Sequence, residues 1–298
     1  MPNEPFEIPG VVRINAGQGG LKRIVVSLPQ ADAEIYLHGA HVTRFDLAGQ
    51  APALFMSKSS MFEAGKPIRG GVPICFPWFG PKKDDSKAPA HGFARLREWK
   101  IESITQPEKD RVVITLMLES DAATRAMWPA DFVMRHIITV GAELQMKLQV
   151  TNKSKDPIRF EQALHTYLSI GDIKQTTVEG LANVKYIDKV DGARTKSQTD
   201  PLIKFTGETD RVYTNTQSMC IVHDDVQRRT IDISKSGSDD TVVWNPWINK
   251  AKAMPDFGDE EWPGMVCVET ANVGEESIGL RPGQTHTMTA TVRTWPSK

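Results

Sequence analysis

The sequence predicts an all-β fold, a large antiparallel β-sandwich. Apolar and polar residues alternate with period two along the whole chain, and turn residues separate the runs. β-Branched and aromatic residues are frequent in these runs. Helical periodicity is confined to short stretches such as 122–127 and 59–63. Many short strands at close spacing are typical of antiparallel sheets packed face to face.

The expected strands follow one another from the first quarter of the chain to its end. They are 23–28, 34–37, 42–47, 111–118, 133–140, 143–151, 158–170, 218–223, 229–234, 241–244, 265–270 and 285–294. The breaks at 140–142 and 152–156 resemble hairpin turns. A length of 298 residues would allow two domains, but large sandwiches form one unit, so we expect a single domain, 1–298.

Three segments resist assignment to strands: 65–89, 188–209 and 245–263. The first is rich in proline and glycine, which interrupt regular structure. Binding sites on sandwiches are commonly built from long irregular loops, so we expect the functional residues near these segments.

Charge limits the possible partners. The chain has 36 basic and 37 acidic residues without long blocks of one sign, so no broad positive field is available to hold nucleic acid. A recognised anion would therefore be small, held by one or two arginines.

The cysteines and the N-terminus indicate a cytoplasmic protein. Cys75, Cys220 and Cys267 lie far apart in apolar runs and are expected to be buried free thiols. The first residues lack the pattern of a secretory leader, and no stretch approaches the roughly 20 apolar residues that span a bilayer. We expect no membrane partner and a monomer.

His165 is the first candidate for chemistry. Alternation along 158–170 places Phe160, Leu164 and Leu168 on one face, and His165 with Tyr167 on the other. His165 therefore faces away from the aliphatic core, on a mixed polar and aromatic face that suits a sugar cleft. Taken alone, the same histidine is better explained by a solvated or supporting position.

Glu269 is the second candidate. It lies in an apolar β run, opposite Val266 and Val268 and on the same face as Cys267. Partial burial would raise the pKa of such a carboxylate toward neutrality, which suits a general base. A cross-strand ion pair with Lys or Arg is the structural alternative.

Two glycine-containing motifs add cationic groups. Arg69 precedes Gly70-Gly71, where the backbone can approach a ligand, and His91 and Arg95 belong to His-Gly-Phe-Ala-Arg. Each motif alone is also compatible with a turn or strand start carrying a solvated arginine.

The sequence contains no metal-binding His-x-x-x-His or Cys-x-x-Cys spacing, no Gly-x-Ser-x-Gly, no phosphate loop and no dinucleotide fingerprint. We therefore expect neither a metal nor a cofactor.

Seven ordered blocks together resemble the aldose 1-epimerase (galactose mutarotase-like) superfamily, most closely its glucose-6-phosphate 1-epimerase branch. The blocks are 38–43 (His-Gly-Ala-His-Val-Thr), 68–81, 91–95, 163–167, 208–213 (Glu-Thr-Asp-Arg-Val-Tyr), 243–247 (Val-Trp-Asn-Pro-Trp) and 267–269 (Cys-Val-Glu). Any one block is weak evidence, but their joint occurrence in this order is specific and covers nearly the whole chain.

The resemblance implies a galactose mutarotase-like supersandwich that interconverts the α and β anomers of a hexose 6-phosphate by opening and reclosing the ring. It implies that His165 is the catalytic acid and Glu269 the base. It also implies sugar-binding roles for His91 and Asp210, and contacts from Arg69 and Arg95 to the 6-phosphate. The expected partner is a small hexose phosphate.

Two alternatives stay open at this point. A mutarotase for unphosphorylated aldoses would need hydrogen bonds rather than two guanidinium groups at the far end of the sugar. A non-catalytic carbohydrate-binding protein on the same fold would not need His165 and Glu269 together.

Overall fold

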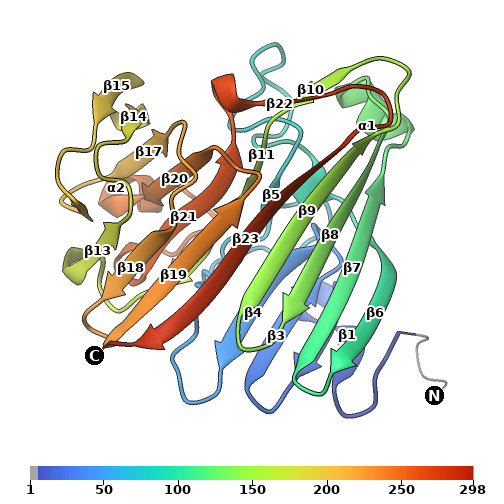
Figure 1. Cartoon of the computed structure of the whole chain (residues 1–298), viewed down its shortest axis with the longest axis horizontal. Coiled ribbons are helices and arrows are strands. Elements are labelled where there is room, and N and C mark those ends of the chain that lie inside the picture. The colour runs from blue at the N-terminus through green and yellow to red at the C-terminus, as the bar shows by residue number, and fades with distance from the viewer. Residues whose placement is uncertain (1–5, 298) are drawn as a thin grey trace.

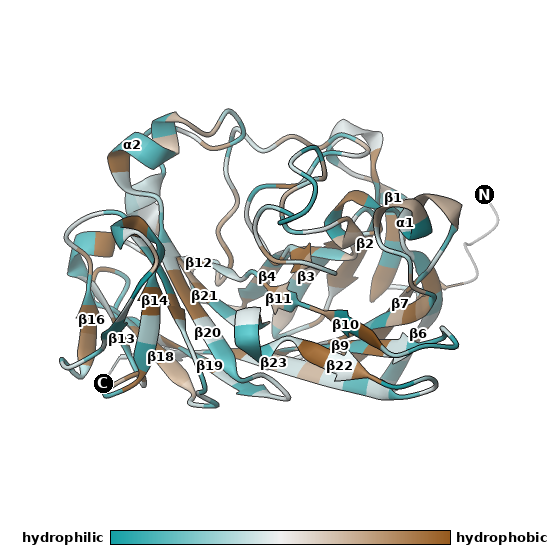
Figure 2. Ribbon diagram, turned by 90° about the horizontal axis from the view of Figure 1, so that it is seen from above, coloured by the Kyte–Doolittle hydropathy of each residue, from teal (hydrophilic) through white to brown (hydrophobic). Residues whose placement is uncertain are grey.

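The computed structural model describes residues 6–297 and confirms the all-β prediction. A nine-stranded antiparallel sheet forms one layer, and a four-stranded and an eight-stranded sheet lie behind it (Figure 1). The helices α1 (Ala122–Met127) and α2 (Trp247–Lys252) lie at opposite ends of this sandwich (Figure 2). Residues 1–5 and 298, the ends of the expected domain, lie outside the described residues.

The nine-stranded sheet supplies the long alternating strands. In sheet order they are β16 (Leu202–Lys204), β13 (Thr176–Glu179), β18 (Cys220–Asp224), β19 (Arg229–Ser236), β23 (Thr285–Pro296), β9 (Leu144–Asn152), β8 (Phe132–Val140), β7 (Arg111–Glu119) and β6 (Lys100–Glu108). Every second residue of β7 and β9 is buried, so one face of each strand packs on the core, as the alternation predicts.

The eight-stranded sheet differs because its central strands are buried on both faces. Its strands are β15 (Arg194–Ser197), β14 (Lys185–Asp188), β17 (Thr209–Tyr213), β20 (Asp240–Asn245), β21 (Met265–Asn272), β11 (Gln162–Leu164) and β5 (Ile74–Cys75), with β12 (Tyr167–Ser169) also pairing with β21. Every residue of β20 and β21 is buried. One face packs on the nine-stranded sheet, so the other face is covered by loops, and the functional site lies there.

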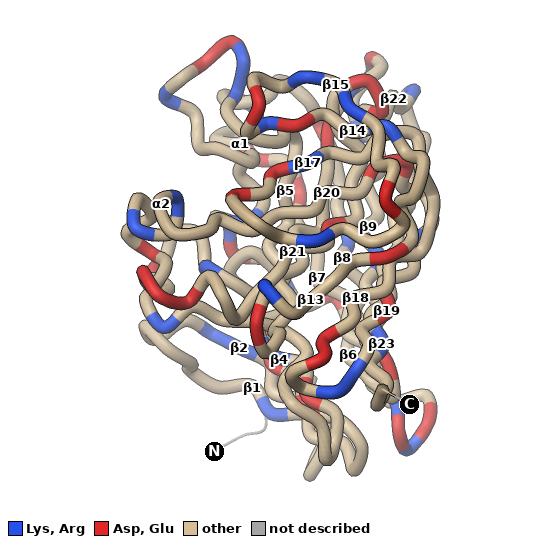
Figure 3. The backbone as a smooth tube through the Cα atoms, turned by 90° about the vertical axis from the view of Figure 1, so that its left-hand side faces the viewer, with Lys and Arg blue, Asp and Glu red and all other residues tan. Residues whose placement is uncertain are grey.

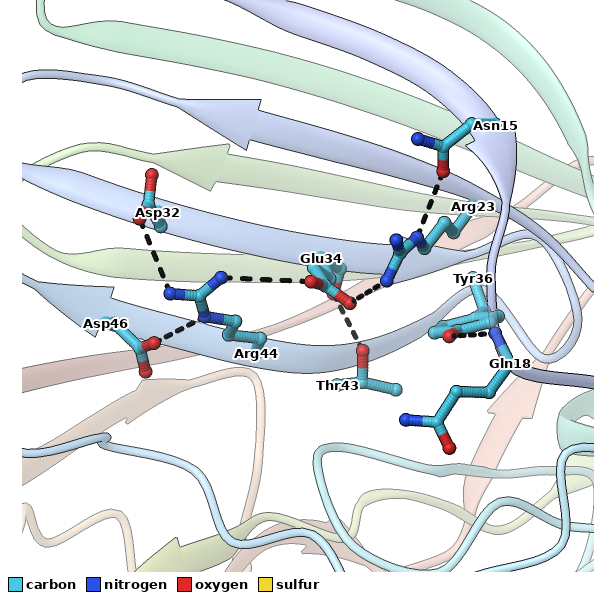
Figure 4. A network of polar contacts seen from close by, with 9 residues as sticks. All are labelled: Asn15, Gln18, Arg23, Asp32, Glu34, Tyr36, Thr43, Arg44 and Asp46. Carbon is cyan, nitrogen blue, oxygen red and sulfur yellow. Dashed lines mark hydrogen bonds and ion pairs between the residues drawn. The ribbon is translucent and has the colours of Figure 1, made fainter.

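The four-stranded sheet consists of β1 (Val12–Ala16), β2 (Lys22–Ser27), β3 (Ala31–Tyr36) and β4 (His41–Leu47). Its outer face carries a chain of ion pairs (Figure 4). Arg44 contacts Asp32, Glu34 and Asp46, and Glu34 also pairs with Arg23 at 2.7 Å. These partly exposed pairs mark a solvated surface and contribute little stability each.

An aromatic cluster between the layers supports the loop that covers the site. The ring of Phe76 makes edge contacts with Phe93, Trp128, Phe132 and Phe160 at centroid distances of 5.2 to 6.1 Å. Such packing contributes about 0.5–1.5 kcal/mol per aromatic pair beyond area burial. The chain on both sides of Phe76 is thereby fixed against the core.

Short connecting elements complete the fold. They are η1 (Gln18–Gly20), η2 (Ala94–Leu96), η3 (Ile173–Gln175), η4 (Lys189–Asp191), η5 (Trp262–Gly264), η6 (Gly274–Glu276) and the two-stranded ribbon of β10 (Ile158–Phe160) and β22 (Ile278–Leu280). The expected helical turn at 122–127 is α1, where Asp121 and Thr124 form a capping box. The expected turn at 59–63 is wrong, because that segment contains no helix.

Three further expectations need correction. The strand expected over 158–170 is divided into β10, β11 and β12, because its parts pair with different strands. The break at 152–156 joins two sheets and is no hairpin, whereas the break at 140–142 is one, since β8 pairs with β9. The three segments expected to be irregular contain regular elements: 65–89 contains β5, 188–209 contains β15 and β16, and 245–263 contains α2.

Acidic and basic residues are interspersed over the side of the molecule shown in Figure 3. Cys75, Cys220 and Cys267 are free and buried, as predicted. Within residues 6–297, neither of the α-helices is long or apolar enough to cross a bilayer.

Candidate active site

All six residues singled out in the sequence line one pocket of about 370 Å³ on the loop-covered face of the eight-stranded sheet. They are Arg69, His91, Arg95, His165, Asp210 and Glu269. Their convergence from positions up to 200 residues apart is the first structural support for a common function.

Strand register places the floor of the pocket. Asp210 on β17 pairs with Trp244 on β20, and Trp244 pairs with Cys267 on β21, so these side chains share a face. The next row on that face contains Val242 opposite Glu269. The predicted shared face of Cys267 and Glu269 is therefore correct.

His165 sits at the break between β11 and β12. Its backbone N–H donates to the Pro73 carbonyl at 3.0 Å. Its ring stacks on Tyr167, with centroids 4.8 Å apart, and meets Trp244 edge-on at 5.9 Å. These contacts hold the imidazole in one orientation toward Glu269, away from the aliphatic core, as the alternation predicts.

His165 and Glu269 form a buried pair. The distance from His165 Nε2 to Glu269 Oε1 is 3.3 Å, and the Glu269 side chain is 1% exposed. Glu269 Oε2 and His165 Nδ1 have no hydrogen-bond partner among the described residues. Unpartnered buried polar atoms are costly, so a bound polar ligand would stabilise this arrangement.

Burial shifts the pKa values of the two groups in opposite directions. Desolvation raises the pKa of Glu269 well above its ordinary value, and the negative charge of Asp210 raises it further. Desolvation lowers the pKa of His165 well below its ordinary value, and the neighbouring His91 and Arg95 act in the same direction. Glu269 is thereby a stronger proton acceptor, and protonated His165 a stronger proton donor, than either group is in water.

His91 presents a defined tautomer to the pocket. The Gly80 backbone N–H donates to His91 Nδ1 at 3.3 Å, and the Cys75 sulfur lies 3.4 Å from the same atom. Because a backbone N–H only donates, Nδ1 is unprotonated and the neutral ring carries its proton on Nε2. Burial lowers the pKa of His91, which keeps the ring neutral. Gly92 permits this turn, since a Cβ there would lie 1.9 Å from the Phe76 carbonyl oxygen.

Arg69 is a paired cation. Its guanidinium binds both carboxylate oxygens of Asp256 at 3.0 to 3.2 Å and donates to the Tyr167 hydroxyl at 2.9 Å. The following Gly71 allows close approach of the backbone, because a Cβ there would lie 2.3 Å from the Val42 carbonyl oxygen. Asp256 thus balances the charge of Arg69.

Arg95 is an unpaired cation. It is only 9% exposed, yet no carboxylate of the described residues lies within ion-pair distance. Nη2 donates to the Ala90 carbonyl at 2.8 Å, and Nε has no partner among the described residues. Burial lowers the pKa of this guanidinium. An uncompensated buried charge is unfavourable, so the position favours an anionic ligand.

The sequence reasoning missed two cations of the pocket, Lys189 and Lys250. Lys189 follows β14 at the start of η4, and Lys250 lies on α2. Both fall in segments expected to be irregular, and their place in those segments was the only signal in the sequence. Neither makes an ion pair with another described residue.

Three atoms of metal-ligand type also meet in the pocket. The donor atoms of His165, Cys267 and Glu269 lie within 4.8 Å of one another. Burial raises the pKa of the Cys267 thiol well above its ordinary value, and the charge of Glu269 raises it further. Two of these donors, Nε2 of His165 and Oε1 of Glu269, are the atoms of the pair described above.

Comparison with known proteins gives a consistent result. The aldose 1-epimerase family matches residues 22–293. Proteins named "Putative glucose-6-phosphate 1-epimerase" are 37% identical in Escherichia coli K12 (86% of this chain, 84% of that protein) and 35% identical in Cenchrus ciliaris (89% and 82%). A crystal structure described as a "putative mutarotase" from Salmonella typhimurium is similar, with a TM-score of 0.91 and 32% identity over 98% of this chain and 96% of that one. The chain therefore belongs to the aldose 1-epimerase family.

Proposed function

We propose that this protein interconverts the α and β anomers of a hexose 6-phosphate, with glucose 6-phosphate as the substrate to test first. Family membership and the names of the relatives support an epimerase. The observation that carries the proposal is the pairing of His165 with Glu269 at 3.3 Å in the same pocket as the unpaired buried guanidinium of Arg95.

Glu269 acts as the base and His165 as the acid. Glu269 removes the proton from the C1 hydroxyl while protonated His165 gives a proton to the ring oxygen, so the C1–O5 bond breaks and the free aldehyde forms. Rotation about C1–C2 presents the other face of the aldehyde, and reversal of both transfers closes the ring as the other anomer. Each positioned group is worth about 10²–10⁴-fold in rate.

The protonation states of His165 and Glu269 suit this cycle. Ring opening starts from the form in which Glu269 is deprotonated and His165 carries the proton, and it ends with the neutral pair, which burial favours. Each turnover returns the pair to the same protonation. His91, neutral with its proton on Nε2, supports the ring oxygen as a hydrogen-bond donor.

The 6-phosphate binds at Arg95 and Arg69. Arg95 brings to the pocket a positive charge that no described carboxylate balances, whereas the charge of Arg69 is balanced by Asp256. Guanidinium groups form short charge-assisted bonds with phosphate oxygens. Asp210 accepts hydrogen bonds from ring hydroxyls.

NMR saturation transfer between the two anomers of glucose 6-phosphate tests this function. We expect the wild-type protein to accelerate exchange above the buffer rate and to do so more efficiently for glucose 6-phosphate than for glucose. Equal efficiency on both sugars would favour a mutarotase for unphosphorylated aldoses. Sugar binding without acceleration would favour a carbohydrate-binding protein.

We also propose a cytoplasmic location, supported by three buried cysteines that are all free, which is typical of a reducing compartment. Cell fractionation tests the location. Sedimentation equilibrium tests the expected monomer.

A further inference from the structure

A lysine that lines the same pocket has no assigned role. Lys189 leaves the eight-stranded sheet directly after β14, whose Asp188 pairs with Arg211 of β17. This register brings Lys189 beside Asp210, and both residues line the pocket. In sheet order, β14 and β17 lie on one side of β21, which carries Glu269, and β5 lies on the other.

The ammonium group of Lys189 is held but not neutralised. Its Nζ lies 4.5 Å from the centroid of the Phe79 ring, a cation–π contact. Phe79 is itself fixed, because its backbone N–H donates to Glu161 at 2.7 Å and the same carboxylate binds the backbone of Gly274. No carboxylate of the described residues forms an ion pair with Lys189.

Asp210 supplies the complementary group. Its carboxylate is held by no hydrogen bond or ion pair among the described residues, although burial raises its pKa and Lys189 and Lys250 lower it. The positive charge of Lys189 also lowers the pKa of Glu269 and of His91, so the ammonium lies near the reacting end of the sugar as well.

We propose that Lys189 is a specificity-determining residue for the sugar ring, donating hydrogen bonds to ring hydroxyls whose protons Asp210 accepts. This inference rests on the proposed function. A donor with three N–H groups beside a free carboxylate matches a pair of neighbouring hydroxyls, each of which donates one hydrogen bond and accepts others. Arg95 and Arg69 approach from other elements, which leaves the phosphate to them.

Substrate analogues distinguish a ring contact from a phosphate contact. We expect Lys189→Met to lower kcat/KM for glucose 6-phosphate by about 10- to 100-fold, the range for a hydrogen bond to a charged group. The loss should be smaller on at least one of the 2-, 3- and 4-deoxy analogues of glucose 6-phosphate, because the contact is already missing there. Lys189 is exposed, so the variant should keep the wild-type Tm.

Lys185→Met is the matched control, since Lys185 is an exposed lysine of the same strand region that does not line the pocket. It should leave all four substrates unaffected. An equal loss with Lys189→Met on all four substrates would assign Lys189 to the phosphate and overturn the inference, as would no loss at all. A wild-type protein that accelerates none of the four would instead overturn the proposed function, and this inference with it.

Discussion

Arg95 provides a prediction in which activity and stability change in opposite directions. In Arg95→Met the aliphatic stem is largely retained, while a buried charge without a carboxylate partner is removed. In the proposed complex the guanidinium of Arg95 donates two charge-assisted hydrogen bonds to the phosphate, and the substitution removes both. At about 1.5 kcal/mol for each bond, the loss is about 3 kcal/mol. Since 1.4 kcal/mol is a factor of ten, kcat/KM for glucose 6-phosphate should fall about 100-fold.

The same substitution should not destabilise the protein. Removing an uncompensated buried charge is favourable, and it offsets the lost bond to the Ala90 carbonyl, worth about 1.5 kcal/mol. We therefore expect the Tm to stay unchanged or to rise. Inorganic phosphate should raise the Tm of the wild-type protein, because a ligand at 100 times its Kd adds about 2.7 kcal/mol, and it should not raise that of the variant.

Steady-state rates from saturation transfer on glucose 6-phosphate and on glucose, together with thermal melts, test these expectations. The reasoning is refuted if Arg95→Met loses the same factor on both sugars, or if the Tm of the variant falls and still responds to phosphate. Either result would make Arg95 a structural residue of the pocket wall.

Three further predictions follow from the same contacts. Arg69→Met should lower the free energy of unfolding by about 2 kcal/mol in urea titrations, because it leaves Asp256 partly buried and unpaired; unchanged stability would contradict this. Asp210→Asn removes a charge that raises the pKa of Glu269, so Glu269 stays deprotonated to lower pH and the acid limb of kcat/KM should move to lower pH; a shift to higher pH would reverse the sign. Phe76→Ala should cost about 3–5 kcal/mol of stability by opening a cavity in the aromatic cluster, and a loss below 1 kcal/mol would show that the loop is fixed by other contacts.

Local alternation was sufficient to predict the faces on which His165 and Glu269 lie. It put His165 off the aliphatic face, although the strand is interrupted at that residue, and it put Glu269 with Cys267 on the pocket side of β21. Both placements follow from the two-residue period of side chains along a strand. This period continues across the break at His165, because β11 and β12 pair with β21 in the same register.

Contacts between distant segments could not be predicted in this way. The pairing of Arg69 with Asp256 joins residues 187 positions apart, and only the folded chain shows that one arginine is balanced while Arg95 is not. Lys189 was missed because a lysine beside a turn is ordinarily solvated, and its place in the pocket depends on the register between β14 and β17. The role of a residue in a binding site depends on such contacts between segments that are far apart in the sequence.

The most direct test of the account is the exchange rate of glucose 6-phosphate anomers with His165→Asn and Glu269→Gln. Near-ultraviolet circular dichroism checks that each variant remains folded. We predict that each substitution lowers the catalysed rate by about 10²–10⁴-fold, because each removes one of the two proton transfers. Near-normal exchange in either folded variant would contradict the assignment of the acid and the base.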